Sequence, residues 1–304
     1  MTVMPISAER INQQAIKFYF VLLIWPVYLF FLPPIVAQFG FFSLLYMIFP
    51  GAYLFTWVGY LLHESWHKYV PTINNRFFYN AFSLLILSDP QVYNLVHPLH
   101  HAHVHTYEDR EFHPLGEIKN RAFRTVYHWL EFVFGVAFLI LVASLVIPHD
   151  HRFAGKYRFW KLSVSLLAAA AFLGGIGYLS HLAFGVSAAQ IALAFGASFW
   201  LHSFFLHQSQ LIEHGNLIVE GPPKARNLWT RNLKPAGVLE KIVLFFTHND
   251  SREHVLHHTA PHLYLRPFPG ETPLPEESRY ITMKDYAGIV KRMLGGIEEK
   301  QVAD

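Results

Sequence analysis

Long apolar runs dominate the pattern of hydrophobic and polar positions along the chain. A transmembrane helix needs roughly 20 predominantly apolar residues. The runs that approach or reach this length lie at residues 18–36, 41–62, 129–147, 162–180 and 186–206. A further run, AFSLLIL at 81–87, is too short to span and is expected to be buried or interfacial. Polar stretches separate the runs, and a polar tail follows at 261–304. The pattern predicts an all-α integral membrane protein with a single domain over residues 1–304.

The composition favours a multi-pass membrane protein over a soluble domain. Hydrophobic residues make up 53% of the chain, charged residues only 15%, and the mean hydropathy is +0.25. The net charge of +3 comes from Lys and Arg beside the apolar runs, which is typical of residues that flank membrane spans. No nucleic acid partner is expected. The N-terminal stretch lacks a small-residue cleavage site, so we expect a retained first helix.

Histidine is the exceptional residue type in this sequence. The chain has 20 His and no Cys. The lack of cysteine excludes disulfides, thiolate zinc sites and cysteine-ligated iron–sulfur clusters as the basis of function. Histidine is the commonest metal ligand in proteins, so its excess indicates a metal site with nitrogen and oxygen ligands.

The histidines gather in three groups with helical spacing. HESWH places His63 and His67 at positions i and i+4, where the second apolar run ends. The segments NLVHPLHHAHVH and EHVLHH each contain H-x-x-H-H, which places three imidazoles on one helix face. We expect the second group to be helical only if its helix begins at Pro98, since proline fits the first turn. With the histidine of IEHGN, the candidate ligands are His63, His67, His97, His100, His101, His214, His254, His257 and His258.

Nine imidazoles exceed what one ion can use, so the count indicates two metal ions. Taken singly, each group is also explained by surface or capping histidines. An extended second segment would instead offer His101, His103 and His105 as an alternating ligand set. His202 and His207 are interpreted as packed or hydrogen-bonded helix residues.

Acidic residues accompany the histidine groups. They are suited to accept hydrogen bonds from the N–H groups of metal ligands, and their alternative interpretation is ordinary solvated charge. These residues are Glu64, Asp109, Glu111, Glu213, Asp250 and Glu253.

Two other classes of protein explain part of the pattern. H-E-x-x-H alone predicts a zinc intramembrane protease with Glu64 as the general base. That interpretation leaves both H-x-x-H-H groups without a role. A non-catalytic metal transporter would be expected to carry polar residues near the middle of its spans, whereas these histidines flank the apolar runs.

The order and spacing of the groups resemble the three histidine boxes of the membrane fatty acid desaturase and hydroxylase superfamily. The resemblance covers residues from about 55 to 270, and it includes EDREF after the second box and IEHGN before the third. It implies a non-haem enzyme in which the nine histidines bind two iron ions and O2 is a co-substrate. It also implies a bundle of about four transmembrane helices under a cytosolic, histidine-rich di-iron cap. Gln210 stands where stearoyl-CoA desaturases carry an Asn that reaches a metal through water.

Membrane topology adds a constraint, because the boxes must share one side of the bilayer. Three candidate runs lie between His101 and His214, so one of them must fail to cross. The basic loop at 148–161 belongs in the cytosol by the positive-inside rule. We therefore expect 129–147 to be re-entrant or interfacial, with 162–180 and 186–206 as an out-and-back pair. The opposite pairing would put the basic loop outside and leave 186–206 as the run that does not cross.

The resemblance implies O2-dependent oxidation of an unactivated C–H bond of a lipid or fatty acyl chain, with fatty acyl desaturation as the leading expectation. HESWHK and IEHGNL resemble alkane hydroxylases, so a hydroxylase, decarboxylase or carotenoid oxygenase on the same scaffold stays open. The chain has no nucleotide-binding fingerprint and no iron–sulfur ligands, so electrons must come from outside. The expected donor is a ferredoxin, rubredoxin or cytochrome b5 with its reductase. A bacterial inner membrane is favoured over the endoplasmic reticulum.

Overall fold

The computed structural model describes residues 8–260 and 274–303. These residues form two compact units. The span unit comprises residues 8–91 and 158–206, and the cluster unit comprises residues 92–157 and 207–303. Helix α9 passes from the first unit into the second without a break.

The span unit contains the longest apolar helices. The helices that lie in it wholly or in part are α1 (Ala8–Phe39), α2 (Ser43–Tyr46), α3 (Tyr53–His67), α4 (Asn75–Leu85), α8 (Phe159–Phe184) and α9 (Ala188–Glu213). Among the described residues, three stretches are long and apolar enough to cross a membrane, namely Ala8–His67, Phe159–Phe184 and Ala188–Glu213. The chain is therefore a mostly helical protein with membrane-spanning helices, and the number of crossings stays a prediction.

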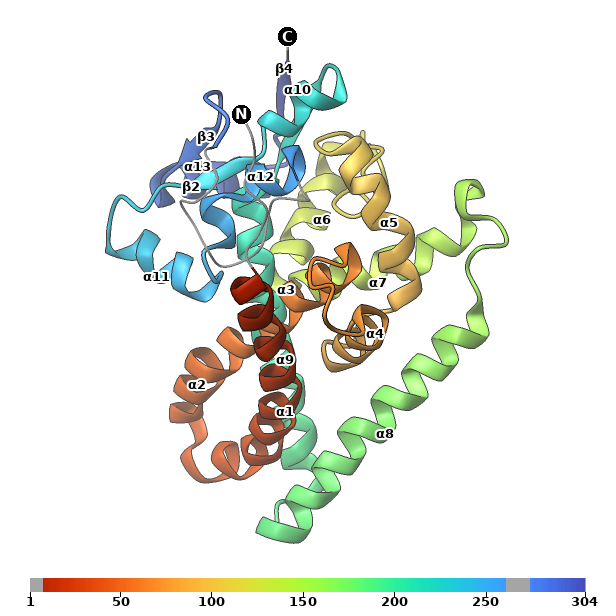
Figure 1. The fold of residues 1–304 in the computed structure, drawn as a ribbon, viewed down its shortest axis with the longest axis vertical. Helices are drawn as coiled ribbons and strands as arrows, with labels where there is room; N and C mark the ends of the chain where they lie inside the picture. The colour runs from red at the N-terminus through yellow and green to blue at the C-terminus, as the bar shows by residue number, and fades with distance from the viewer. Residues whose placement is uncertain (1–7, 261–273, 304) are drawn as a thin grey trace. The chain divides into compact units, whose positions relative to one another are not determined.

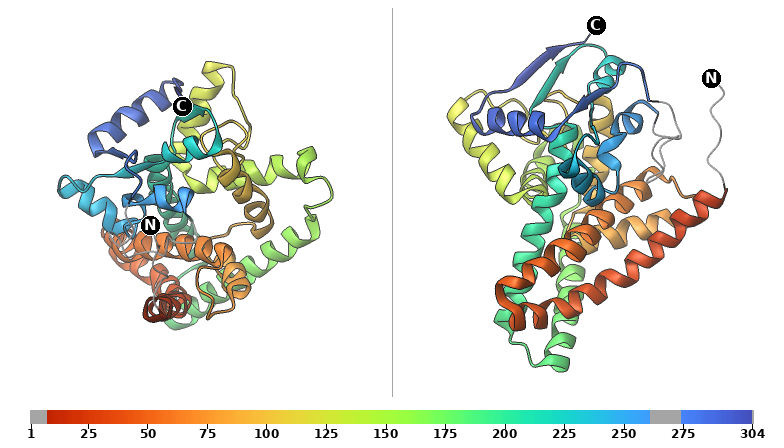
Figure 2. Two further views of the ribbon diagram at one scale, coloured as in Figure 1. Left: turned by 45° about the horizontal axis from the view of Figure 1, so that its top comes forward. Right: turned by 90° about the vertical axis from the view of Figure 1, so that its left-hand side faces the viewer.

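The stretch Ala8–His67 folds back on itself as an antiparallel hairpin, visible in red and orange in Figures 1 and 2. The chain reverses at Gly40, whose φ of +52° is a conformation that glycine adopts without strain. Contacts between the arms then run in opposite order: Trp25 packs against Phe55 with ring centroids 5.8 Å apart, and Gln14 near the start of α1 donates a hydrogen bond to Glu64 near the end of α3. Aromatic packing therefore holds the two arms together along much of their length.

The apolar run expected at 129–147 is divided between two helices of the cluster unit. Helix α6 (Arg121–Phe134) ends at Gly135, whose φ of 61° and ψ of −144° interrupt the helix, and α7 (Val136–Val146) follows. The shorter apolar helix Val136–His149 is below the length of the three candidate spans. The assignment of this run as re-entrant or interfacial stays a prediction.

The cluster unit combines short helices with two small parallel strand pairs. Its remaining elements are α5 (Pro90–His103, begun in the span unit), β1 (Leu217–Glu220), α10 (Pro223–Leu228), β2 (Arg231–Leu233), α11 (Val238–Phe246), α12 (His254–Thr259), β3 (Arg279–Ile281), α13 (Met283–Leu294) and β4 (Glu299–Val302). Strand β1 pairs with β4, and β2 pairs with β3 (Figure 2). An all-α fold therefore describes the protein only coarsely.

The polar tail expected at 261–304 is folded where it is described. Residues 261–273 and 304 lie outside the described residues. From 274 to 303 the chain packs onto the cluster unit through β3, α13 and β4. Buried side chains of α13, Tyr286 and Met293, join a core with Leu211 and Ile212 of α9. The C-terminal segment therefore stabilises the end of the helix that leads to His214.

The prediction that a helix must begin at Pro98 is wrong. Helix α5 starts at Pro90 and continues through Pro98 to His103. A proline inside a helix removes one backbone hydrogen bond, here to the carbonyl of Asn94. Pro98 and Asn94 both lie on the exposed face of α5, where water can satisfy that carbonyl. The histidines of the second box therefore keep their helical spacing.

Candidate metal centre

The cluster unit brings seven of the nine candidate histidines together. Helix α5 supplies His97, His100 and His101, the end of α9 leads to His214, and α12 supplies His254, His257 and His258. All are buried except the half-buried His101. Their positions i, i+3 and i+4 place the three side chains of each box on one helix face, as the spacing predicts.

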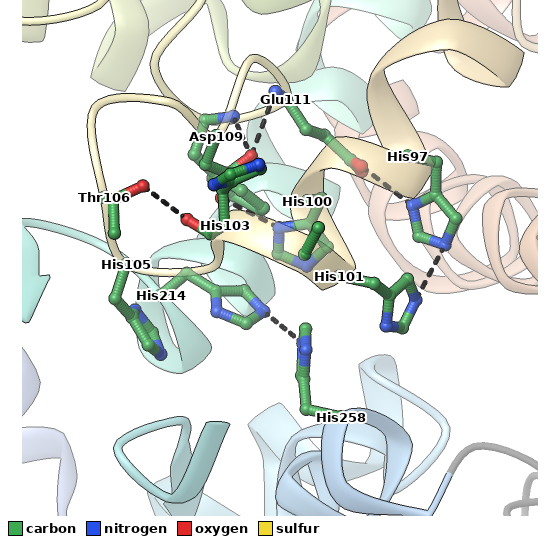
Figure 3. Close-up of polar contacts among 12 residues, drawn as sticks. His97, His100, His101, His103, His105, Thr106, Asp109, Glu111, His214 and His258 are labelled. Atoms are coloured by element: carbon green, nitrogen blue, oxygen red, sulfur yellow. Dashed lines mark hydrogen bonds and ion pairs between the residues drawn. The ribbon is translucent and has the colours of Figure 1, made fainter. Parts of the chain in front are cut away.

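One group consists of His97, His101 and His257, whose ring nitrogens converge (Figure 3 shows the first two). The Nε2 atom of His101 lies 3.2 Å from Nε2 of His97 and 3.1 Å from Nε2 of His257. Their ligand atoms all lie within 4.8 Å of one another. These three imidazoles could hold one metal ion.

A second group consists of His100, His214 and His258, joined by His254. The Nε2 atom of His214 lies 3.3 Å from Nε2 of His258 and 3.0 Å from Nε2 of His254. Ligand atoms of His100, His214 and His258 lie within 4.8 Å of one another, as do those of Glu213, His214 and His254. The cluster unit thus contains two adjacent groups of candidate ligands, and the number of ions that they hold stays a prediction.

Carboxylates determine which nitrogen of each ring faces inward. His97 Nδ1 donates to Glu111 Oε2 at 2.8 Å, and His100 Nδ1 donates to Asp109 Oδ2 at 2.8 Å (Figure 3). His254 Nδ1 lies 3.2 Å from Asp250 Oδ2. A neutral imidazole whose Nδ1 carries the proton presents a bare lone pair at Nε2. The lone pairs of facing Nε2 atoms would repel one another unless a cation lay between them.

The spacing between the facing nitrogens fits a shared metal ion. Two nitrogens about 2.1 Å from one ion, at tetrahedral or right angles, lie about 3.0 to 3.4 Å apart. The observed Nε2 separations of 3.0 to 3.3 Å fall in this range. A purely hydrogen-bonded pair would need a proton on one Nε2, which the carboxylate at Nδ1 disfavours for His97. The residues therefore fit a histidine-bound metal pair.

Burial also favours the form that binds metals at two of the imidazoles, whereas at His100 the effect of burial is outweighed by the carboxylates of Asp109 and Glu111, which raise the pKa. Burial lowers the pKa of His214 and of His258 well below the usual range, and the neighbouring His100 adds to the effect in both cases. Metal ligands must be deprotonated, so neutral rings at ordinary pH are ready to coordinate.

The first box lies in the span unit. His63 and His67 occupy the last turns of α3 with ring centroids 4.7 Å apart, and His67 stacks on Tyr69. Glu64 lies between them in sequence, is buried, and accepts a hydrogen bond from Gln14. The two histidines are therefore adjacent on one helix, as their spacing predicts.

Three expected supporting residues lie in the cluster unit with different contacts. Asp109 holds His100, as expected for an acceptor beside a ligand. Glu213 accepts a hydrogen bond from Ser251 at 2.7 Å, and its Oε2 lies 3.5 Å from His254 Nε2, among the candidate ligand atoms. Gln210 accepts a hydrogen bond from His207 Nδ1 at 3.1 Å.

The alternative ligand set H-x-H-x-H is not formed, because α5 stays helical through His103. His105 follows the helix with a φ of +61° and contacts Thr230 at 3.2 Å. No sequence pattern points to two residues that position α12. Asn232 accepts a hydrogen bond from the backbone of Val255, and Asn227 donates one to the carbonyl of His258. A six-residue helix needs such anchors because it is too short to be stable alone.

Comparison with known proteins gives one match. The family model for fatty acid desaturases matches residues 37–266, which include all nine candidate histidines. Searches of curated proteins and of solved structures each found no match.

Proposed function

Because the chain belongs to the fatty acid desaturase family, we propose that it is a membrane-bound oxidoreductase that oxidises an unactivated C–H bond of a lipid or fatty acyl chain with O2. The proposed reaction is fatty acyl desaturation at a centre of two iron ions. The observation that supports it most is the set of Nε2 atoms that face one another, together with the carboxylates that hold Nδ1 of His97 and His100.

We propose that all nine histidines of the three boxes bind the two irons. The groups His97, His101, His257 and His100, His214, His258, with His254, would supply seven ligands. The resemblance to the family assigns His63 and His67 to the same centre. Iron held in this way would pass electrons from the external donor to O2 and so activate it toward a C–H bond.

The protein's own residues orient the ligands and exclude water. Glu111, Asp109 and Asp250 keep the imidazoles of the second and third boxes turned inward. Phe112 packs its ring against His100 and His214, with centroid distances of 5.1 and 4.9 Å. An apolar side chain at this place limits access of water to the buried nitrogens.

The proposed topology places the boxes on the cytosolic side of about four crossings. The hairpin in Ala8–His67, together with α8 and α9, would supply the crossings. The interruption at Gly135 supports the view that residues 129–147 do not cross. Helix α6 also exposes apolar side chains such as Phe123, Val126 and Trp129 to the outside, which suits a helix lying in the interface.

The proposed electron donor is a ferredoxin, rubredoxin or cytochrome b5 with its reductase, and a basic surface would steer an acidic partner of this kind. The described residues carry a charged patch in which Lys119, Arg121, Arg124 and Lys300 outnumber Glu117 and Glu298, with Arg124 paired to Glu298 at 2.9 Å.

The test of the function is lipid mass spectrometry of cells that express the chain, with and without O2. Desaturation would remove two hydrogens from an acyl chain, hydroxylation would add one oxygen, and decarboxylation would remove the carboxyl carbon. Purified protein should contain about two irons per chain. A preparation that is active with a single zinc would refute the di-iron proposal.

A further inference from the structure

A second buried polar chain lies beside the histidine cluster and has no part in the proposed ligand set. It runs through His128 and Glu131 of α6 and His207 and Gln210 of α9, all in the cluster unit. His128 Nδ1 lies 2.7 Å from Glu131 Oε2, Glu131 Oε1 lies 3.3 Å from His207 Nε2, and His207 Nδ1 lies 3.1 Å from Gln210 Oε1. These contacts form a continuous polar network.

Helix α6 exposes apolar side chains and buries polar ones. Its apolar residues Phe123, Val126 and Trp129 are about half exposed, whereas His128 and Glu131 on the opposite face are buried. A helix on a protein core normally shows the reverse arrangement. Burying a carboxylate and two imidazoles costs free energy unless they are paired, and here Glu131 lies between the two imidazoles.

Glu131 is the charged group of this polar network. Burial by itself raises the pKa of Glu131, but hydrogen bonds from His128 and His207 outweigh it and lower the pKa to about 2. Glu131 is therefore a carboxylate. Both nitrogens of His207 face oxygen acceptors, Glu131 Oε1 and Gln210 Oε1. His207 Nδ1 donates to Gln210, so Nε2 is the nitrogen that can exchange a proton with Glu131.

The polar chain leads toward a candidate ligand. His207, Gln210 and His214 stand at i, i+3 and i+7 on α9 and its C-terminal end, so they share one helix face. At the other end His128 keeps 11% of its side chain accessible, while His207 is fully buried. The polar network therefore runs from His128, near the surface, to Gln210, which lies about one helical turn before His214.

Protons are needed at the centre whichever oxidation occurs. Desaturation of a CH2–CH2 unit consumes one O2, two electrons and two protons, and yields the double bond and two waters. Hydroxylation consumes the same and yields an alcohol and one water. The electrons come from the external donor, and the protons must pass through protein because the ligands are buried.

We propose that His128, Glu131 and His207 form a proton-delivery path to the metal centre, with Gln210 as a positioning residue. The proposal rests on the proposed O2-dependent function. A proton taken up at His128 passes from Nδ1 to Glu131 Oε2. Rotation of the resulting carboxylic acid brings this proton to His207 Nε2, and His207 Nδ1 releases its own proton toward the face of α9 that carries His214. Water would carry the proton over the roughly two helical turns between His207 and His214.

The test is a single-turnover measurement on the full-length, iron-loaded protein in lipid nanodiscs. Protein reduced with dithionite is mixed with O2 in H2O or D2O, and the lipid product, peroxide release and iron content are measured. For Glu131→Gln we expect product formation to slow by about tenfold or more. The solvent isotope effect should increase and peroxide should be released, with iron content unchanged. An unchanged isotope effect and no peroxide would overturn the proposal.

A second variant keeps the test valid if Glu131→Gln folds poorly. His128→Ala removes the end of the path nearest to the surface, and added imidazole should restore product formation in this variant. Lack of rescue would contradict the relay. The matched control is Asp150→Asn, which removes another buried carboxylate of the cluster unit, paired with Arg152 at 2.6 Å. The Asp150→Asn variant should leave the solvent isotope effect and the release of peroxide unchanged.

The outcome for the relay can be separated from that for the function. If the wild-type protein binds no iron or oxidises no lipid, the proposed function fails. If the wild type is active and both relay variants behave like it, only the relay fails.

Discussion

Two regions of the molecule bury histidine in opposite ways. In the span unit, His202 of α9 is fully buried, and its Nε2 lies 3.0 Å from the carbonyl oxygen of Met47 and 3.2 Å from Ser198 Oγ. In the cluster unit, His97 and His101 point Nε2 at each other at 3.2 Å, while Glu111 holds Nδ1 of His97.

The difference lies in the partners of the ring and not in its burial. His202 is satisfied by oxygen atoms of its own unit, so it needs no cation and serves packing. His97 and His100 of the cluster have Nδ1 occupied by a carboxylate, so their Nε2 atoms present lone pairs to the neighbouring imidazoles. A buried histidine is therefore expected to bind metal when its Nε2 faces another imidazole.

Removal of a ligand should have the largest effect. We expect His101→Ala or His258→Ala to abolish lipid oxidation, because each removes an imidazole from one of the two groups. Iron per chain, measured by elemental mass spectrometry, should fall in parallel. Full turnover in either variant would exclude that residue as a ligand. His181→Gln is a suitable control, because His181 donates to the carbonyl of Val186 within the span unit.

Weakening a carboxylate should have an intermediate effect. In Asp109→Asn the side chain keeps an oxygen for the backbone of Glu111 but loses the charge that holds His100 Nδ1. Loss of such a supporting group lowers metal affinity by about 10- to 100-fold. Competition with a chelator would measure the change, and unaltered affinity would show that Asp109 does not tune the centre.

Disturbing the surroundings of His202 should affect stability more than metal binding. In Gly51→Ala the new Cβ would overlap Tyr28 Oη and lie 2.5 Å from His202 Nε2. Overpacking of this kind costs about 1 to 3 kcal/mol. Thermal unfolding in detergent should show a lower midpoint with iron per folded chain unchanged. Gly174→Ala is the matched control, since nothing lies within 4 Å of its added Cβ.

Glu64→Gln should have the smallest effect. The glutamine keeps an oxygen that can accept the hydrogen bond from Gln14, so a di-iron oxidase should be weakened at most. A zinc protease with Glu64 as general base would lose its activity. Lipid product and cleavage of a membrane peptide, measured on the same preparation, separate the two.

The class of protein and the candidate ligands can be predicted from the sequence alone. Apolar runs reveal membrane-spanning helices because the bilayer demands length and hydrophobicity, which are local properties. The spacings H-x-x-x-H and H-x-x-H-H place imidazoles on one face because the helical period is fixed. The family match over residues 37–266 confirms the resemblance that these spacings indicated.

Which atoms contact one another depends on the tertiary structure. The pairing of His97 with Glu111, of His100 with Asp109 and of Glu131 with His207 depends on loops and on helices far apart in the chain. The same holds for β1 with β4, since strands of four residues carry too few positions for a recognisable pattern. Side-chain spacing within one helix is set locally. Whether a histidine is a metal ligand or a structural residue depends on which atoms tertiary packing places beside its two ring nitrogens.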